Sequence, residues 1–307
     1  MDELTNDPRS ASAIPPKREI FKWFEEVVPA RGCKISLGDI KSLYEELSAI
    51  NQRFGKEVIA TLPRNSDMND VEWEQYKTYL LQDAFCLTVS IRGEGDQTLY
   101  GEEAGVFESE NLPHPIRTIY FNNVTAWRRH ASNTEPQNRL EVFLDFGKPP
   151  LLDPSSVLSE PTPNESSVTV RADDMTFFRA VRQVIDNKLL AHRKWHSAIH
   201  KSFAYDAGIW FLALPAALIV ATYYMQLWLP VGGSYEAYRW AFFMYAVGAI
   251  ILGYRFLTGY AKWAFPVNVL TDNKDTSFRH RLVLGGILSW LGYKAADALY
   301  AVSPFSL

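Results

Sequence analysis

The distribution of apolar residues changes near residue 206 and predicts two differently built regions. Before this point, short apolar runs alternate with charged residues, as they do in a domain that folds in water. After it, residues 207–235 carry no charged side chain, and this stretch exceeds the roughly 20 residues that span a bilayer core. A second apolar stretch covers residues 238–262. The pattern therefore predicts an integral membrane protein with a soluble head.

The first part of the soluble region predicts a pair of amphipathic helices. Residues 18–28 place apolar side chains at helical spacing. Ser36 is a suitable N-cap for a second helix, which keeps its apolar residues on one face over residues 37–50. We expect a short extended piece at residues 57–62, after a glycine. Residues 71–81 predict a further helix, and the spacing of Trp73, Tyr76 and Tyr79 leaves a strand as the alternative.

The middle of the soluble region alternates apolar and polar residues with period two, which predicts antiparallel strands. The expected strands are residues 85–91, 98–100, 116–124, 140–146 and 167–171. Asp173 or Asp174 then provides an N-cap for an amphipathic helix that can cover the sheet. Several antiparallel strands closed by a C-terminal helix form an order that resembles pleckstrin-homology-like domains. This resemblance carries no motif and implies only an α+β, PH-like fold for the head.

These patterns divide the chain into five segments. We expect a disordered polar leader (1–16), a cytoplasmic α+β head (17–190), a basic juxtamembrane stalk (191–206), a transmembrane helical hairpin (207–265) and an amphipathic or re-entrant C-terminal segment on the cytoplasmic side (266–307). The leader shows no apolar stretch of the signal-peptide type.

The C-terminal segment allows two interpretations. Residues 282–293 are apolar but too short to cross a bilayer comfortably, which favours an interfacial helix or one packed on the hairpin. A third crossing over residues 281–302 is the alternative. It would bury Lys294 and Asp297, and central charges cost about 3 kcal/mol each on insertion scales.

Positive charge on both flanks of the hairpin predicts its orientation. The loop between the two spans carries only Glu236 and Arg239, whereas basic residues gather before the first span and after the second. By the positive-inside rule, we expect both termini in the cytoplasm. The membrane that the hairpin crosses is then the plasma (inner) membrane. The residues expected at the interface with the anionic inner leaflet are Arg193, Lys194, Lys201, Arg255, Lys262, Arg279 and Arg281. For Arg255, snorkelling to the interface is favoured over a pore-lining or charge-sensing role.

Small residues recur every four positions on both spans. They are Ala213, Ala217 and Ala221 on the first span, and Ala249 and Gly253 on the second. This spacing lets helix backbones approach closely. It predicts helix packing within the hairpin, and the alternative is the interface of a homo-oligomer.

Three histidines, His192, His196 and His200, recur every four residues before the first span and would form one stripe on a helix. A pair at this spacing can ligate a transition metal, but a helix rises about 12 Å over eight residues, so all three cannot reach one ion. We favour a titratable basic collar at the membrane surface. A metal site with further ligands from elsewhere is the alternative.

No pattern typical of an enzyme occurs in the chain. Gly93 and Gly95 lack the following GKS or GKT of a phosphate loop, and no GxSxG, HExxH or paired CxxC is present. With 31 basic against 35 acidic residues, most of the latter in the head, nucleic-acid binding is not expected. We expect no cofactor, and two lone cysteines fit a reduced, cytosolic head.

The sequence therefore favours a non-enzymatic membrane protein whose cytoplasmic domain binds a protein partner or ligand, as a membrane-anchored sensor or scaffold. One alternative is an oligomeric membrane effector or small channel that perturbs the bilayer on a signal. A second alternative is a membrane-tethered, metal-dependent enzyme, which rests only on the histidines.

Overall fold

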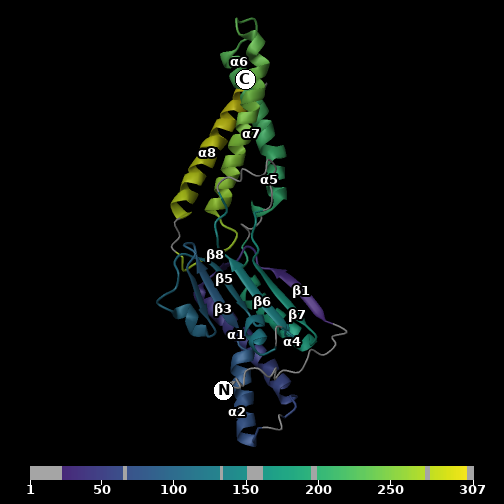
Figure 1. The fold of residues 1–307 in the computed structure, drawn as a ribbon. Coiled ribbons are helices and arrows are strands. Elements are labelled where there is room, and N and C mark those ends of the chain that lie inside the picture. Colours follow the sequence, from purple (N-terminus) through teal and green to yellow (C-terminus); the bar gives the residue numbers. More distant parts are fainter. Residues whose placement is uncertain are drawn as a thin grey trace, which may run out of the picture. The chain divides into compact units, whose positions relative to one another are not determined.

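The computed structural model describes residues 23–64, 68–131, 134–150, 162–194, 199–273 and 277–302. It divides into two units, which Figure 1 shows with their elements labelled. The head unit contains the chain up to Gly147 together with Asn164–Lys194 and Asn268–Lys274. The helical unit contains Lys148–Pro163, Trp195–Val267 and Asp275–Leu307.

The head unit is built on a six-stranded antiparallel sheet with strand order β1-β7-β6-β5-β3-β4. Its strands are β1 (Phe24–Pro29), β3 (Thr88–Gly93), β4 (Thr98–Gly101), β5 (Ile116–Asn122), β6 (Arg139–Asp145) and β7 (Ser167–Ala172). The register joins buried residues into rows across the sheet. One such row is Val28, Val168, Val142, Phe121 and Val89. Alternation along each strand thus supplies one apolar face, as the sequence predicts.

Two helices, α1 (Leu37–Ala60) and α4 (Met175–Lys188), bury their apolar sides in one core with this face of the sheet. The rings of Phe54 and Phe177 meet edge to face across the two helices, 5.1 Å apart. Ser36 and Asp39 form a capping box at the start of α1, and Asp174 caps α4. Both predicted N-caps are therefore confirmed.

A smaller core lies where α2 (Asp70–Ala84) and α3 (Val124–His130) meet the end of α1. Its buried members are Ile59, Leu80, Ala84, Phe85, Trp127 and Ala131. The predicted helix over residues 71–81 is confirmed as α2, which begins with a capping box of Asn69 and Glu72.

Two predicted elements of the head are wrong. The first helix, expected over residues 18–28, is in its described part the strand β1, because Val27 and Val28 pair with β7 at the sheet edge. The helical pair is instead α1 and α2. The extended piece expected at residues 57–62 is the last part of α1 and its C-cap, Thr61.

The helical unit contains two helices long and apolar enough to cross a membrane, Phe203–Trp228 and Glu236–Ala264. The first comprises α5 (Ser202–Gly208), a π-helical turn (Ile209–Ala213) and α6 (Leu214–Trp228), and the second is essentially α7 (Arg239–Ala264). Pro215, at the start of α6, lacks the N–H that would donate to the previous turn. That loss accounts for the π-helical turn before it.

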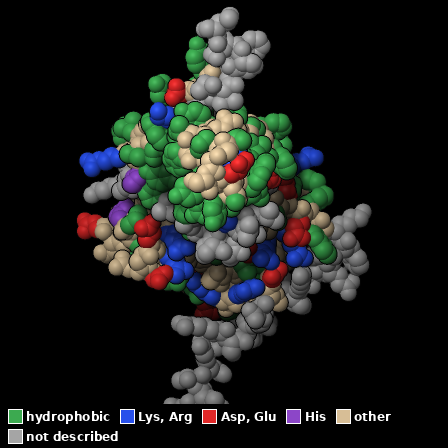
Figure 2. Space-filling model, turned by 90° about the horizontal axis from the view of Figure 1, so that it is seen from above, with side chains coloured by type: hydrophobic (Ala, Val, Ile, Leu, Met, Phe, Trp, Pro, Cys, Tyr) green, Lys and Arg blue, Asp and Glu red, His purple; other side chains and the backbone are tan. Residues whose placement is uncertain are grey.

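A third long helix, α8 (Ser277–Val302), contacts both α6 and α7. Large apolar side chains on all three are exposed, among them Trp228, Trp240 and Trp290. Figure 2 shows such side chains gathered over the helices. Ala213, Ala217 and Ala221 are buried against neighbouring helices, whereas Ala249 and Gly253 are exposed.

The chain returns to the head unit after α7. There β8 (Val269–Leu270) pairs in parallel with β2 (Lys34–Ile35). Leu270 is buried in the main core. The sequence assigns this segment to the C-terminal region of the chain, but it is part of the folded head.

Candidate functional site

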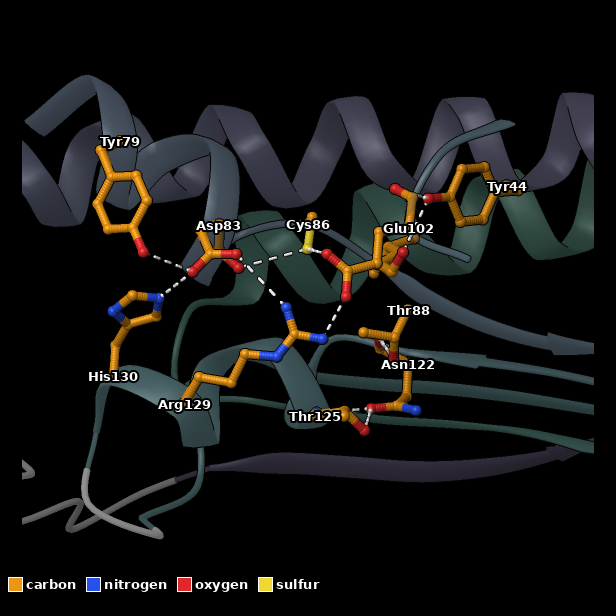
Figure 3. A network of polar contacts seen from close by, with 11 residues as sticks. Tyr44, Tyr79, Asp83, Cys86, Thr88, Glu102, Asn122, Thr125, Arg129 and His130 are labelled. Carbon is orange, nitrogen blue, oxygen red and sulfur yellow. Dashed lines mark hydrogen bonds and ion pairs between the residues drawn. The ribbon is translucent and has the colours of Figure 1, made fainter. Parts of the chain in front are cut away.

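The head carries a cluster of charged side chains near the start of β3, drawn in Figure 3. We call Asp83, Glu102, Arg129 and His130 the charged cluster. Asp83 lies in the last turn of α2, Glu102 follows β4, and Arg129 and His130 lie in the last turn of α3. The cluster therefore brings together three segments that are separate in the sequence.

Every member of the charged cluster has a partner of opposite charge or a hydrogen bond. His130 Nε2 lies 2.6 Å from Asp83 Oδ2, and the hydroxyl of Tyr79 donates to the same oxygen at 3.2 Å. The guanidinium of Arg129 bridges Asp83 Oδ1, at 3.4 Å, and Glu102. Partial burial raises the pKa of Asp83, but the bonds from His130 and Tyr79 and the charge of Arg129 outweigh it, so this pKa lies below its usual value.

Cys86 lies beside the cluster but is a poor nucleophile. Its thiol donates to the carbonyl oxygen of Asp83 at 3.3 Å and approaches Glu102 Oε2 at 3.9 Å. Burial, together with the negative charge of Glu102, raises the pKa of Cys86 to about 11. Because the thiolate is the reactive form, this cysteine reacts slowly near neutral pH.

The Asp83–His130 pair has the form of a base and its orienting carboxylate. General base catalysis also needs a nucleophile within hydrogen-bond reach of the imidazole. The ring of Tyr79 contacts that of His130, and its hydroxyl donates to Asp83. The arrangement is therefore suited to clamping α2, α3 and the segment after β4 together.

The cavity next to this region is too small for a substrate. It lies between α1, α3 and the chain before β6, measures about 20 Å³ and is lined by residues that include Asn51, Phe85, Asn123 and Trp127. A volume of this size holds about one water molecule. A second, shallow groove follows one face of α2, from Asp70 to Gln82.

The three histidines do not lie on one helix. α4 ends at Lys188, His192 lies in a short 3₁₀ turn (Leu190–His192), and Arg193 is extended. His196 lies outside the described residues. His200 belongs to the helical unit, where its Nε2 donates to the carbonyl oxygen of Phe265 at 2.6 Å.

Its other ring nitrogen, Nδ1, lies 2.9 Å from Thr162 Oγ1. Within the described ranges, no group of three or more His, Cys, Asp or Glu side chains is placed to hold a metal ion. The metal site therefore stays a prediction without a structural counterpart in these ranges.

The residues predicted at the membrane interface occupy different environments. Arg193 donates to the carbonyl oxygen of Pro29 at 2.6 Å, and the backbone N–H of Lys194 donates to Gly32 O at 2.8 Å, both inside the head unit. Arg281 donates to Ala264 O at 3.0 Å inside the helical unit. Lys201 and Arg279 are exposed, and Arg255 and Lys262 are half-buried in α7.

A second polar site was not predicted from the sequence. Residues 268–273, which we call the docked segment, place Asn268, Asp272 and Asn273 against the head. A run of polar residues shortly after Pro266 is the available signal, and it is equally typical of a surface turn.

No family model, no curated protein and no solved structure matches this chain. The likeness to pleckstrin-homology-like domains therefore stays a prediction.

Proposed function

We propose that the protein is a non-enzymatic, membrane-anchored sensor or scaffold whose cytoplasmic head binds a protein partner or ligand. One observation carries the proposal. The head unit is assembled from chain segments that precede and follow the two apolar helices.

This assembly supports a hairpin in the membrane. A folded domain cannot pack together across a bilayer, so Lys194 and Asn268 belong on the same side of it. The chain between them must cross the membrane an even number of times. Two apolar helices lie in this interval, and the basic flanks favour the cytoplasm for the head.

The connections between the two units support communication rather than loose tethering. Three residues separate the end of α7, at Ala264, from Asn268, and three separate Asn273 from the start of α8, at Ser277. A ligand that alters the head would therefore act on α7 and α8 through short links. A helix that only anchors the head in the membrane needs a single connection to it.

The chemistry of the charged cluster supports a non-enzymatic head. The guanidinium of Arg129 is paired with both carboxylates, burial keeps the thiol of Cys86 in its protonated form, and the adjacent cavity has room for about one water.

The topology is tested by cysteine accessibility in intact cells, in a chain whose Cys33 and Cys86 are replaced by Ser. Ser234→Cys should react with an impermeant thiol reagent, and Ser10→Cys should not. A cysteine at Ser306 should stay unreactive if the C-terminus is cytoplasmic, and its labelling would make α8 a third crossing. Reaction at Ser10 alone would overturn the orientation.

The function is tested on the full chain purified in mild detergent. We expect a cytoplasmic protein or ligand to co-purify in stoichiometric amount. The chain reconstituted into dye-loaded vesicles should leave them sealed.

The second candidate, an oligomeric membrane effector or small channel, is favoured by one observation. Gly253 is exposed on α7, and apart from the backbone of its own helix turn and its chain neighbours no heavy atom lies within 4 Å of the position that its Cβ would occupy. A second copy could approach closely there. Dye release, together with a mass above that of one chain, would favour this candidate over the sensor.

A further inference from the structure

We propose that the head contains a binding site for an extended peptide and that the docked segment fills this site as a releasable strand. This inference goes beyond the proposed function, because it concerns a site inside the head whatever partner the head binds.

The centre of the site is the side chain of Asn268, which is 1% exposed. Its Oδ1 accepts from the backbone N–H of Cys33 at 2.9 Å. Its Nδ2 donates to Ala30 O at 3.0 Å and to Ser166 Oγ at 2.8 Å, and it lies 3.3 Å from Asp145 O. The groups that contact this side-chain amide come from three segments, which are the chain before β2, the end of β6 and the chain before β7.

The backbone of the docked segment adds a strand to β2. Val269 N–H donates to Cys33 O and Thr271 N–H donates to Ile35 O, both at 2.9 Å. The side chain of Leu270 is buried in the main core. Backbone pairing with an apolar anchor and one recognised polar side chain is the usual pattern of peptide binding by strand addition.

The end of the docked segment makes two further polar contacts. Asp272 Oδ2 accepts from Leu37 N–H at 2.7 Å, at the first turn of α1, where an anion is favourable. Asn273 brackets Ile116: its Oδ1 accepts from the backbone N–H at 3.0 Å and its Nδ2 donates to the carbonyl oxygen at 2.9 Å.

These contacts are specific but local. The paired strands are only two residues long, and so short a ladder is marginal by itself. Occupancy therefore depends on Asn268 and its neighbours, and the segment can leave without disrupting the six-stranded sheet. Proteins open locally in contiguous units without unfolding completely, and a pairing of two residues is small enough to be such a unit.

Cys33 reports on the occupancy of the site. It is 1% exposed, it lies directly against Asn268, and its thiol donates to Leu189 O at 3.5 Å. Burial raises the pKa of Cys33 to about 11, partly offset by the charge of Arg193. Release of the docked segment would uncover this thiol and speed its reaction with a maleimide.

The experiment uses the full chain in detergent, with Cys86→Ser so that Cys33 is the sole thiol. Asn268→Ala should raise the Cys33 labelling rate by about tenfold or more, since it leaves a buried N–H without its acceptor. In the companion background, Cys33→Ser, the same change should leave the rate at Cys86 unaltered.

The matched control is Asn51→Ala, which removes another buried amide of the head. Asn51 donates to Phe85 O, next to Cys86. This change should therefore affect Cys86 and spare Cys33. Asp272→Ala, a milder change at the rim of the site, should raise the Cys33 rate by a few-fold. It provides the test if Asn268→Ala fails to fold.

A synthetic peptide of residues 266–273 then tests whether the site accepts a peptide added in trans. It should restore protection of Cys33 in the Asn268→Ala chain, and the same peptide with Ala at position 268 should not. Three results would overturn the proposal: no change at Cys33 in either variant, equal acceleration at Cys33 and Cys86, or failure of the peptide to protect.

Discussion

The head contains two polar sites that differ in charge and in depth. The charged cluster holds four ionisable side chains, but these are 15–42% exposed. The site around Asn268 is neutral and almost completely buried. The second holds segments that are more distant in the sequence, since Cys33 and Asn268 are 235 residues apart.

The difference shows that burial matters more than formal charge for the strength of a contact. Water and salt screen exposed ion pairs, which typically contribute about 0–1 kcal/mol. A buried amide that loses its partner leaves an unsatisfied group in the interior, which costs about 1–3 kcal/mol. We therefore expect substitutions at Asn268 to be more damaging than substitutions in the charged cluster.

The largest expected effect is that of Asn268→Asp. This nearly isosteric change replaces the donor that faces Ala30 O by a charged acceptor. An uncompensated buried charge lowers the free energy of unfolding by about 3–5 kcal/mol. Denaturant unfolding of the full chain in detergent, followed by tryptophan fluorescence, measures it. Asn111→Asp adds the same charge at an exposed position and should change little. Equal effects would contradict the comparison.

A smaller effect, about 1 kcal/mol at pH 7, is expected for Asp83→Asn, because the bonds to a charged carboxylate are weakened. The folded-state pKa of Asp83 is lowered, so its stabilisation is fully present above the unfolded value of about 3.9. It is lost as the pH falls through the folded pKa. The difference in the free energy of unfolding between wild type and variant should therefore disappear at acidic pH.

Unfolding measured at a series of pH values, from neutral to acidic, tests this. Asp173→Asn, at an exposed aspartate, is the control and should show no such difference. A difference that widens on acidification would contradict the assignment of Asp83 as the stabilising carboxylate.

The smallest effect, about 0.5 kcal/mol, is expected for Arg129→Ala, whose side chain is 42% exposed. Adding salt should reduce the difference further, because exposed charges are screened. Unfolding at low and high ionic strength measures both. A salt-independent loss as large as that of Asn268→Asp would show that the charged cluster is as important as the buried amide.

Gly55 shows why the local sequence pattern gave a wrong prediction for residues 57–62. In the sequence this glycine suggests the end of a helix, and an extended piece is expected after it. In the structure α1 continues to Ala60. A Cβ at position 55 would stand 2.5 Å from the ring of Phe85, so the glycine makes room for that ring. The reason lies in packing between elements.

The residues of β1 show a second limit. Phe24, Val27 and Val28 fit a helical spacing, but β-branched residues are also favoured in strands. Pairing with β7 decided between the two. No feature of the local sequence contains that partner, which lies more than a hundred residues later.

The sequence by itself determined the elements that depend on short-range periodicity. These are the alternation of the central strands, the N-caps at Ser36 and Asp174, and two helices apolar enough to cross a membrane. Each follows from residues a few positions apart, so the physical cause is visible in a short window.

Only the tertiary structure decided which distant segments complete the head. The charged cluster joins α2, α3 and the chain after β4, and the docked segment returns to the head after α7. From the sequence, Asn268 is typical of a turn. In the structure, its side chain is bonded to the backbone groups of Ala30 and Cys33. Its role arises from burial and from partners that local sequence does not specify, because chain folding alone brings them together.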